Sequence, residues 1–338
     1  MDYSHTEKAM KVHRIFLPLL IIFSCATLKD APLKDLPADR EYVISVQRVI
    51  DSRLPSLTEA QFQDMLDRLQ GYIREYLGYR VSFYLMGNQD LLMFSKSMDF
   101  SESAETMKAL KNDLLDMDSP ADHQRLRDYI FKLVSRTETK VLRRYVKDYD
   151  TFESREKLAD HLYRQYVVKL KRIQNITTAD GTPLNAPAYA ETLTYPFWDM
   201  ALMHLKNAHF IFTNTVMADM EVNIPIYVVL RYGVTTGMVE KNLYNSYRAA
   251  GILFTYPFLS ADGFFVSERG EAIPPEELTD VIALYATHEF GHFLNHYKDY
   301  YDHDNCIMVA AMDLNYYQWY RLRKEKKCDL KHEKLKQF

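Results

Sequence analysis

The sequence predicts an α+β fold, in which a mixed sheet is combined with a long candidate active-site helix, a helical insertion and a small C-terminal subdomain. Three observations predict it. A strand–helix–strand pattern opens the folded part of the chain, a charged stretch with helical periodicity and no glycine occupies about 101–175, and strand patterns resume before a long apolar helix. Glycine is scarce, with 10 among 338 residues, which also favours helices over a sandwich or barrel.

Residues 1–25 are predicted to be a secretion signal and residues 26–40 a polar tether. Three basic residues precede the apolar run 15–23, which is too short for a comfortable membrane span. The end of this run, IFSC, resembles the lipobox of bacterial lipoproteins. The resemblance implies a lipid on Cys25, secretion across the bacterial inner membrane and anchoring in the cell envelope, with the membrane as a partner. An ordinary cleaved signal and a signal-anchor are the alternatives.

The folded part begins with a predicted strand–helix–strand unit. Residues 42–51 are rich in valine and isoleucine and predict a strand. In the helix that follows, Thr58 and Gln61 have capping-box spacing, and Gly78 is placed to end the helix. Residues 79–87 alternate as a second strand. Two strands joined by one helix predict parallel pairing.

Residues 101–175 are predicted to form several helices inserted in, or covering, the sheet domain. Apolar side chains recur in them at helical spacing, as in Leu126, Ile130 and Leu133. A helical subdomain used only for packing explains this pattern, and a lid or substrate wall is the functional alternative. The loop 176–187 predicts a boundary.

Four apolar runs then predict further strands, at 209–214, 224–234, 251–259 and 263–267. Two prolines followed by two glutamates, at 274–277, predict the start of the long helix. This helix is predicted to end at Asn295, which divides an N-terminal subdomain, residues 41–295, from a C-terminal subdomain, residues 296–338.

The long helix carries the motif HEFGH. On a helix, His288 and His292 lie one turn apart on one face, so both imidazoles can bind a single ion. Glu289 lies beside them and can act as the base for a zinc-activated water. Histidine nitrogens together with one carboxylate suit Zn²⁺, which is therefore the expected cofactor.

The wider sequence resembles the metzincin clan of zinc peptidases, whose signature HExxHxxGxxH, or HExxHxxGxxD, is followed by a methionine-containing turn beneath the metal. Asn295 stands where that signature has glycine, and asparagine also tolerates a left-handed helix exit. Lys298 stands at the third-ligand position and cannot bind zinc. The segment KDYYD also resembles the PDxYD of immune-inhibitor-A-type metallopeptidases, which implies Asp299 as the third ligand.

Other side chains remain alternatives for the third ligand. Asp302 and His303 can reach the metal if the loop after Asn295 is longer, whereas His296 requires the helix to end early. The run CIM resembles the C-x-M of archaemetzincins and implies Met308 as the methionine of the Met turn.

The chain has three cysteines. If Cys25 carries lipid, Cys306 and Cys328 remain as a pair in an oxidising compartment, and we expect a disulfide between them that contributes about 3 kcal/mol. Two unpaired buried thiols are the alternative for a chain that stays in the cytosol.

Together these features predict a zinc-dependent peptidase whose N-terminal subdomain hydrolyses peptide bonds in a peptide or protein substrate, with Glu289 as general base. The formal net charge of −4 gives no case for nucleic acid as a partner. The alternative is a catalytically inactive zincin-fold lipoprotein that serves as an envelope binding or assembly module.

Overall fold

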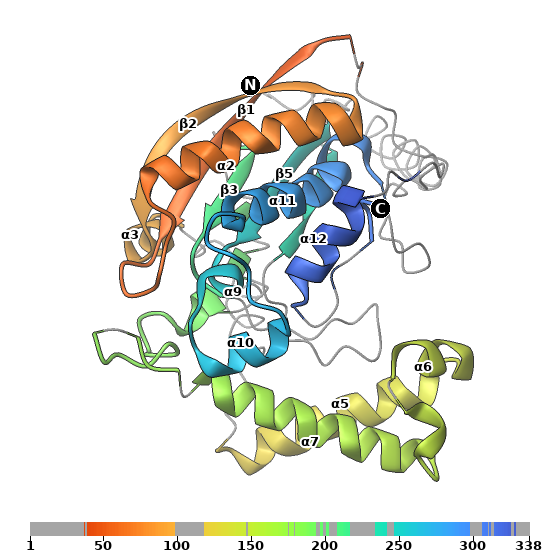
Figure 1. The fold of residues 1–338 in the computed structure, drawn as a ribbon. Helices are drawn as coiled ribbons and strands as arrows, with labels where there is room; N and C mark the ends of the chain where they lie inside the picture. Colours follow the sequence, from red (N-terminus) through yellow and green to blue (C-terminus); the bar gives the residue numbers. More distant parts are fainter. Residues whose placement is uncertain are drawn as a thin grey trace, which may run out of the picture.

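The computed structural model describes residues 37, 39–98, 118–146, 148–174, 176–178, 180–193, 197–198, 201–202, 208–216, 234–241, 247–297, 306–309, 311, 314–325 and 328. The predicted signal, most of the tether and most of the predicted strand 224–234 lie outside these residues. Figure 1 shows a sheet crossed by helices, with a separate group of helices below it in the view.

The sheet has five strands in the order β2-β1-β3-β5-β4. The strands are β1 (Glu41–Ile50), β2 (Arg80–Asp90), β3 (Phe210–Thr213), β4 (Val234–Lys241) and β5 (Tyr247–Phe254). Neighbouring strands are parallel except at one edge, where β4 runs antiparallel to β5. The combination of helices with this mixed sheet confirms the α+β prediction at the level of fold class.

The predicted strand–helix–strand unit is confirmed. Helix α2 (Glu59–Tyr72) begins at a complete capping box, in which Gln61 N donates to Thr58 Oγ1 at 3.2 Å and Thr58 N donates to Gln61 Oε1 at 3.0 Å. A π-helical turn, η1 (Ile73–Leu77), follows, and the chain turns at Gly78 with φ 79°. This left-handed conformation favours glycine. Strands β1 and β2 pair in parallel, as predicted.

Apolar layers cover both faces of the sheet. On one face, α2 and the long helix α11 (Leu278–Asn295) run side by side, and Phe290 of α11 stacks on Phe210 of β3 with ring centroids 4.6 Å apart. On the other face, α3 (Leu91–Ser97) contributes Phe94, which stacks on the fully buried Trp198 at 5.8 Å. The central strands β3 and β5 are therefore buried on both sides where they pair, as is usual for parallel strands, whereas much of the edge strand β2 is exposed.

The described part of the predicted helical region consists of helices joined by short turns. It contains α5 (Pro120–Arg136), α6 (Thr139–Tyr145), a 3₁₀ turn η2 (Tyr149–Thr151) and α7 (Arg155–Gln174). Of the predicted apolar stripe in α5, Leu126 and Ile130 are buried and Leu133 is partly buried, and α7 likewise buries Leu158 and Leu162. Helices α5 and α7 pack on each other below the sheet in Figure 1.

Two strand predictions are wrong in the stretch before α11. The segment 263–267 is helix α10 (Gly263–Arg269), and the predicted strand 251–259 ends at Phe254 and gives way to α9 (Tyr256–Leu259). A short apolar run is compatible with either helix or strand, so tertiary contacts decide. Here Arg269 donates to the carbonyls of Phe258 and Ser260, both at 2.6 Å, and ties α10 to the end of α9.

The remaining described helices are a 3₁₀ turn, η3 (Ala190–Leu193), and α12 (Tyr316–Glu325), which lies beside α11. None of the helices in the described part of the chain is both long and apolar enough to cross a membrane.

Candidate metal centre

Helix α11 carries the HEFGH motif through the interior. The predicted helix start is confirmed, because Glu277 is the N-cap and the helix begins at Leu278. Every residue from Thr279 to Asn295 is buried. The three side chains His288, Glu289 and His292 are each only 2% exposed. Polar groups withdrawn from water to this extent must be satisfied by hydrogen bonds or by an ion.

Both imidazoles are oriented by backbone carbonyl groups. His288 Nδ1 lies 2.8 Å from the carbonyl oxygen of Ile307, and His292 Nδ1 lies 2.6 Å from that of Tyr297. A carbonyl oxygen only accepts hydrogen bonds, so each Nδ1 carries the proton and donates it. In the neutral rings each Nε2 therefore presents a lone pair, which is the form that binds a metal.

The two Nε2 atoms lie 3.3 Å apart, with the ring planes nearly perpendicular at 88°. Two lone pairs at this distance repel each other unless a cation or proton lies between them. Zinc with Zn–N bonds of about 2.0–2.1 Å and tetrahedral angles places two nitrogen ligands about 3.3–3.4 Å apart. The spacing of the two atoms therefore fits a zinc ion.

Glu289 completes the group of possible ligands. Its Oε1 lies 3.4 Å from His288 Nε2, and the possible ligand atoms of His288, Glu289 and His292 all lie within 4.8 Å of one another. The structure thus brings together the three residues that the motif predicts. Within the described ranges this group does not include His296.

The exit from α11 differs from the sequence prediction by one residue. Asn295 is still helical, and the left-handed residue is His296, with φ 56°. The expectation that Asn295 forms the left-handed exit is therefore wrong. The backbone N–H groups of His296 and Tyr297 both point to the Gly291 carbonyl, which closes the helix end. Just beyond this exit, the Tyr297 carbonyl lies against His292.

The chain returns beneath the motif at residues 306–309. The Met308 side chain is fully buried against α11, where a Cβ atom built on Gly291 would lie only 2.2 Å from the Met308 sulfur. The predicted Met-turn residue thus lies directly under the motif. Asp299, Asp302 and His303 lie outside the described residues.

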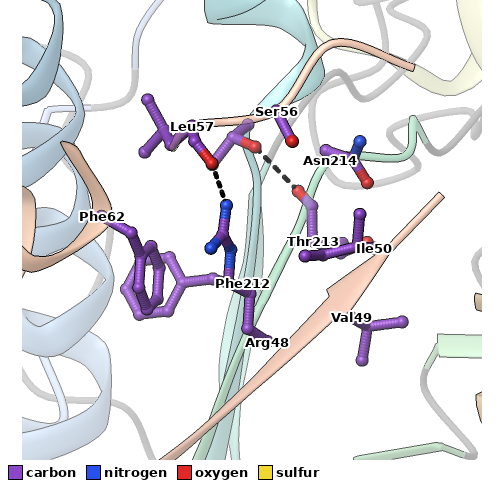
Figure 2. A pocket seen from close by; sticks show the side chains of 10 residues that line it. Arg48, Val49, Ile50, Ser56, Leu57, Phe62, Phe212, Thr213 and Asn214 are labelled. Carbon is purple, nitrogen blue, oxygen red and sulfur yellow. Dashed lines mark hydrogen bonds between the residues drawn. The ribbon is translucent and has the colours of Figure 1, made fainter. Parts of the chain in front are cut away.

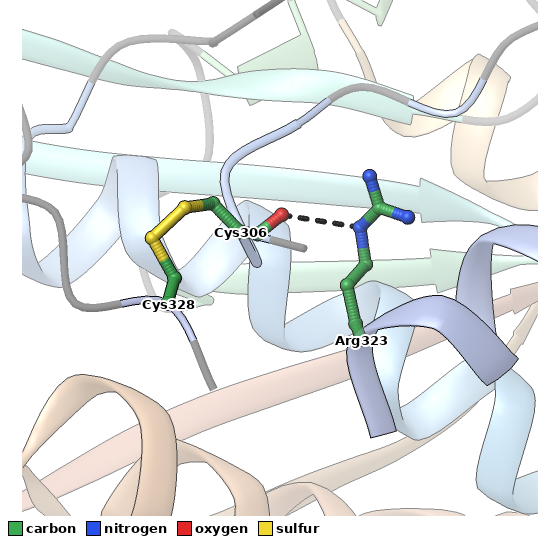
Figure 3. Close-up of a disulfide and its surroundings, with 3 residues drawn as sticks. All are labelled: Cys306, Arg323 and Cys328. Carbon is green, nitrogen blue, oxygen red and sulfur yellow. Dashed lines mark hydrogen bonds between the residues drawn. A yellow bond between two sulfur atoms is a disulfide. The ribbon is translucent and has the colours of Figure 1, made fainter. Parts of the chain in front are cut away.

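Cys306 and Cys328 are joined as a disulfide, with Cα atoms 4.7 Å apart and a separation of 22 positions in sequence (Figure 3). The bond links the segment under the motif to the chain beyond α12. Cys25 lies outside the described residues.

Aromatic side chains surround the first histidine. Tyr285 stacks on the His288 ring at 5.7 Å, and Trp319 of α12 approaches it edge-on at 6.3 Å. Tyr316 is buried next to Tyr285, with ring centroids 4.8 Å apart. Burial, together with the negative charge of Glu289, raises the pKa of the Tyr316 phenol, which therefore stays protonated.

A buried acid lies two turns before the motif on the same helix. Asp280 accepts hydrogen bonds from Tyr72 and Tyr320, both at 2.5 Å, from Arg68 at 3.1 Å and from Lys324. Burial by itself raises the pKa of Asp280, but the hydrogen bonds from these four side chains outweigh it and lower the pKa to about 2. Asp280 therefore joins α11 to α2 and α12.

A second polar feature lies at the carboxyl ends of the parallel strands (Figure 2). Arg48 is buried there and contacts Glu59 at 2.8 Å, the Leu57 carbonyl, and the face of the Phe62 ring at 4.6 Å. The adjoining cavity is only about 10 Å³, roughly the room that one water molecule needs. The cavity is too small for an organic ligand, and we assign the Arg48 contacts a structural role.

The sequence motif identifies the candidate ligands but not the groups that orient them. The Ile307 and Tyr297 carbonyls, Trp319 and the Asp280 cluster belong to no recognisable pattern. The run CIM was a signal for Met308 in the segment 306–309, but not for the Ile307 carbonyl that contacts His288. Comparison of the chain with protein-family models, with curated proteins and with solved structures finds no match. The function is therefore inferred from the geometry of the motif.

Proposed function

We propose that this protein is a zinc-dependent peptidase with a metzincin-like fold, in which His288 and His292 bind the ion and Glu289 is the general base. One observation carries the proposal. Both imidazoles are held with Nδ1 donating to a backbone carbonyl, so that two Nε2 lone pairs converge at 3.3 Å. This arrangement is costly without a cation and matches the ligand spacing of tetrahedral zinc.

The chemistry proposed for the motif is hydrolysis. Bound zinc supplies a Lewis acid that polarises a peptide carbonyl and lowers the pKa of water. Glu289, at 3.4 Å from His288 Nε2, takes a proton from the attacking water and delivers it to the leaving amine. The substrate is accordingly a peptide or protein.

The helix exit supports Asp299 as the third ligand. In the resembling signature the third ligand follows the left-handed glycine by three residues. Here the left-handed residue is His296, one position later than the signature places it. Three residues further on is Asp299 rather than Lys298. The shift of one residue thus accounts for a lysine at the signature's ligand position.

The N-terminal sequence supports a proposal about the cellular location of the protein. A basic segment, a short apolar run and Cys25 support secretion with a lipid on that cysteine, anchoring the enzyme in a bacterial envelope. A Cys25→Ser variant should move the protein from the membrane fraction to the soluble fraction, and retention on the membrane would count against the lipid.

The enzyme proposal is tested with Glu289→Gln, using Glu276→Gln, an exposed acid just before α11, as the matched control. We expect Glu289→Gln to bind one zinc per chain and to lose hydrolysis of a peptide library, because an amide cannot accept the proton. Glu276→Gln should retain both properties. Equal cleavage by Glu289→Gln and wild type would refute the mechanism, and wild-type protein without stoichiometric zinc would refute the site.

One observation favours a second candidate function. The motif side chains are only 2% exposed, and closed zinc sites are typical of structural rather than catalytic metals. The alternative is a zincin-fold lipoprotein that uses zinc to stabilise an envelope binding or assembly module. In that case Glu289 is itself a ligand, so Glu289→Gln would lose zinc and stability, and wild type would cleave no peptide.

A further inference from the structure

The segment 306–309 determines the state of the first ligand. The Ile307 carbonyl accepts the His288 Nδ1 proton at 2.8 Å, and the next side chain, Met308, packs on the motif helix at Gly291. Any rotation of the Ile307 peptide group would remove the acceptor that keeps the proton on Nδ1. The groups that fix this segment therefore influence how His288 presents Nε2.

Helix α12 holds the segment at both ends. Arg323 Nε donates to the Cys306 carbonyl at 3.1 Å, one residue before Ile307 (Figure 3). Trp319 Nε1 donates to the Val309 carbonyl at 2.5 Å, two residues after Ile307. The Ile307 peptide group thus lies between two backbone carbonyls that are each fixed by a side chain of α12.

Arg323 is suited to this contact by its shape and its surroundings. The side chain is only 3% exposed. Its Nη1 donates to the Trp319 carbonyl at 2.9 Å, and the guanidinium lies 4.4 Å from the Trp319 ring centroid. A planar guanidinium can make both hydrogen bonds and the ring contact at once, whereas a lysine ammonium is a point charge on a flexible stem. Arg323 therefore links Trp319 of α12 to the backbone of Cys306.

We propose that Arg323 is a positioning residue of the zinc site. By fixing the Cys306 carbonyl it orients the next peptide group, whose Ile307 carbonyl keeps His288 in the Nδ1-protonated tautomer with Nε2 directed at the ion. The disulfide from Cys306 to Cys328 holds the same residue through its side chain. The inference rests on the zinc site proposed above, but it concerns the orientation of a ligand and can be tested without metal.

The test compares Arg323→Lys with Arg321→Lys in the full-length protein. Arg321 lies on the same helix, is exposed and pairs with Glu271 at 2.6 Å, so it controls for the loss of a guanidinium on α12. The first measurement is the ¹⁵N NMR spectrum of the histidine rings in metal-free protein, which reports the tautomer. The second is zinc affinity by competition with a chelator.

We expect Arg323→Lys to convert part of His288 to the other tautomer and to leave His292 unchanged, because His292 is held by Tyr297 instead. Zinc affinity should fall by about 10–100-fold, the usual effect of losing an outer-shell partner. Arg321→Lys should match wild type in both measurements. An unchanged His288 tautomer in Arg323→Lys overturns the proposal, even if zinc affinity falls.

The two proposals can fail separately. If wild-type protein binds no zinc, the proposed function fails, while the His288 tautomer in Arg323→Lys still decides the positioning role. If Arg323→Lys does not fold, Trp319→Phe removes the hydrogen bond to Val309 and the indole that lies against the Arg323 guanidinium, and it should shift the His288 tautomer in the same direction. An unchanged His288 tautomer in Trp319→Phe likewise overturns the proposal.

Discussion

The contact between Gly291 and Met308 makes a specific prediction about the motif helix. In the interior of a helix, Gly→Ala normally stabilises by about 1 kcal/mol. At Gly291 the added Cβ would lie 2.2 Å from the Met308 sulfur and 3.0 Å from its terminal methyl group. An ordinary contact needs at least 3.4 Å. The sulfur must therefore retreat by more than 1 Å, and Met308 is fully buried.

Forcing an extra methyl group into a packed site costs about 1–3 kcal/mol. After the gain in helix propensity, Gly291→Ala should lower the free energy of unfolding by about 0–2 kcal/mol. In a Met308→Ala background the obstacle is gone, so the same substitution should raise the free energy of unfolding by about 1 kcal/mol. The sign of the effect thus depends on residue 308, with a coupling energy of about 1–3 kcal/mol.

Urea denaturation, followed by the fluorescence of the buried Trp198 and Trp319, measures these free energies. Gly71→Ala is the matched control, because Gly71 also lies within a helix and nothing lies within 4 Å of its added Cβ. It should stabilise by about 1 kcal/mol in both backgrounds. If Gly291→Ala stabilises as much as Gly71→Ala while Met308 is present, the close packing of Met308 under the motif is refuted.

Three further perturbations have expected outcomes. Asp280 has a folded-state pKa of about 2 against an ordinary 3.8, so its contribution is present above about pH 4 and lost as the pH falls toward 2. Arg68 and Lys324 are almost half exposed, so solvent screens their interaction with Asp280. We therefore expect Asp280→Asn to lower the free energy of unfolding by about 1–2 kcal/mol near pH 7 and by less at pH 2. Urea denaturation at both pH values measures the two losses, and equal losses would contradict the prediction. Reduction of the 306–328 disulfide should lower the free energy of unfolding by about 3 kcal/mol, and an unchanged midpoint in urea with and without reductant would argue against the bond. Thr58→Ala should cost about 1 kcal/mol through loss of the capping box, whereas Thr58→Asn should stay close to wild type in thermal denaturation.

Local signals allowed much of the fold to be predicted. The capping box at Thr58, the turn at Gly78 and the acidic start of α11 each depend on neighbouring residues, and each is present in the structure. The parallel pairing of β1 and β2 followed from one strand–helix–strand pattern. Where the apolar run was short, as at 263–267, periodicity could not distinguish a helix from a strand. In the structure this run is helical, and Arg269 at its end donates a hydrogen bond to the Phe258 carbonyl of α9.

The candidate site was predictable only in part, for a related reason. His288 and His292 are neighbours by helical spacing, which sequence reveals. Their orientation depends on the carbonyl groups of Ile307 and Tyr297, and any residue type can supply a carbonyl. The left-handed residue was expected at Asn295 because Asn295 stands at the signature's glycine and asparagine tolerates this conformation, whereas the chain turns one residue later, at His296.

The hydrogen bond from His288 to Ile307 joins residues 19 positions apart and has a consequence for how the protein matures. The chain emerges from the ribosome or a translocon with its N-terminus first. The whole motif helix therefore emerges before Ile307, whose carbonyl accepts the hydrogen bond from His288. Truncation just before Cys306 would keep that helix and lose the acceptor, the underlying methionine and the disulfide partner. In the proposed zinc site, competence to bind metal would therefore arise late, once residues 306–309 have docked beneath the helix.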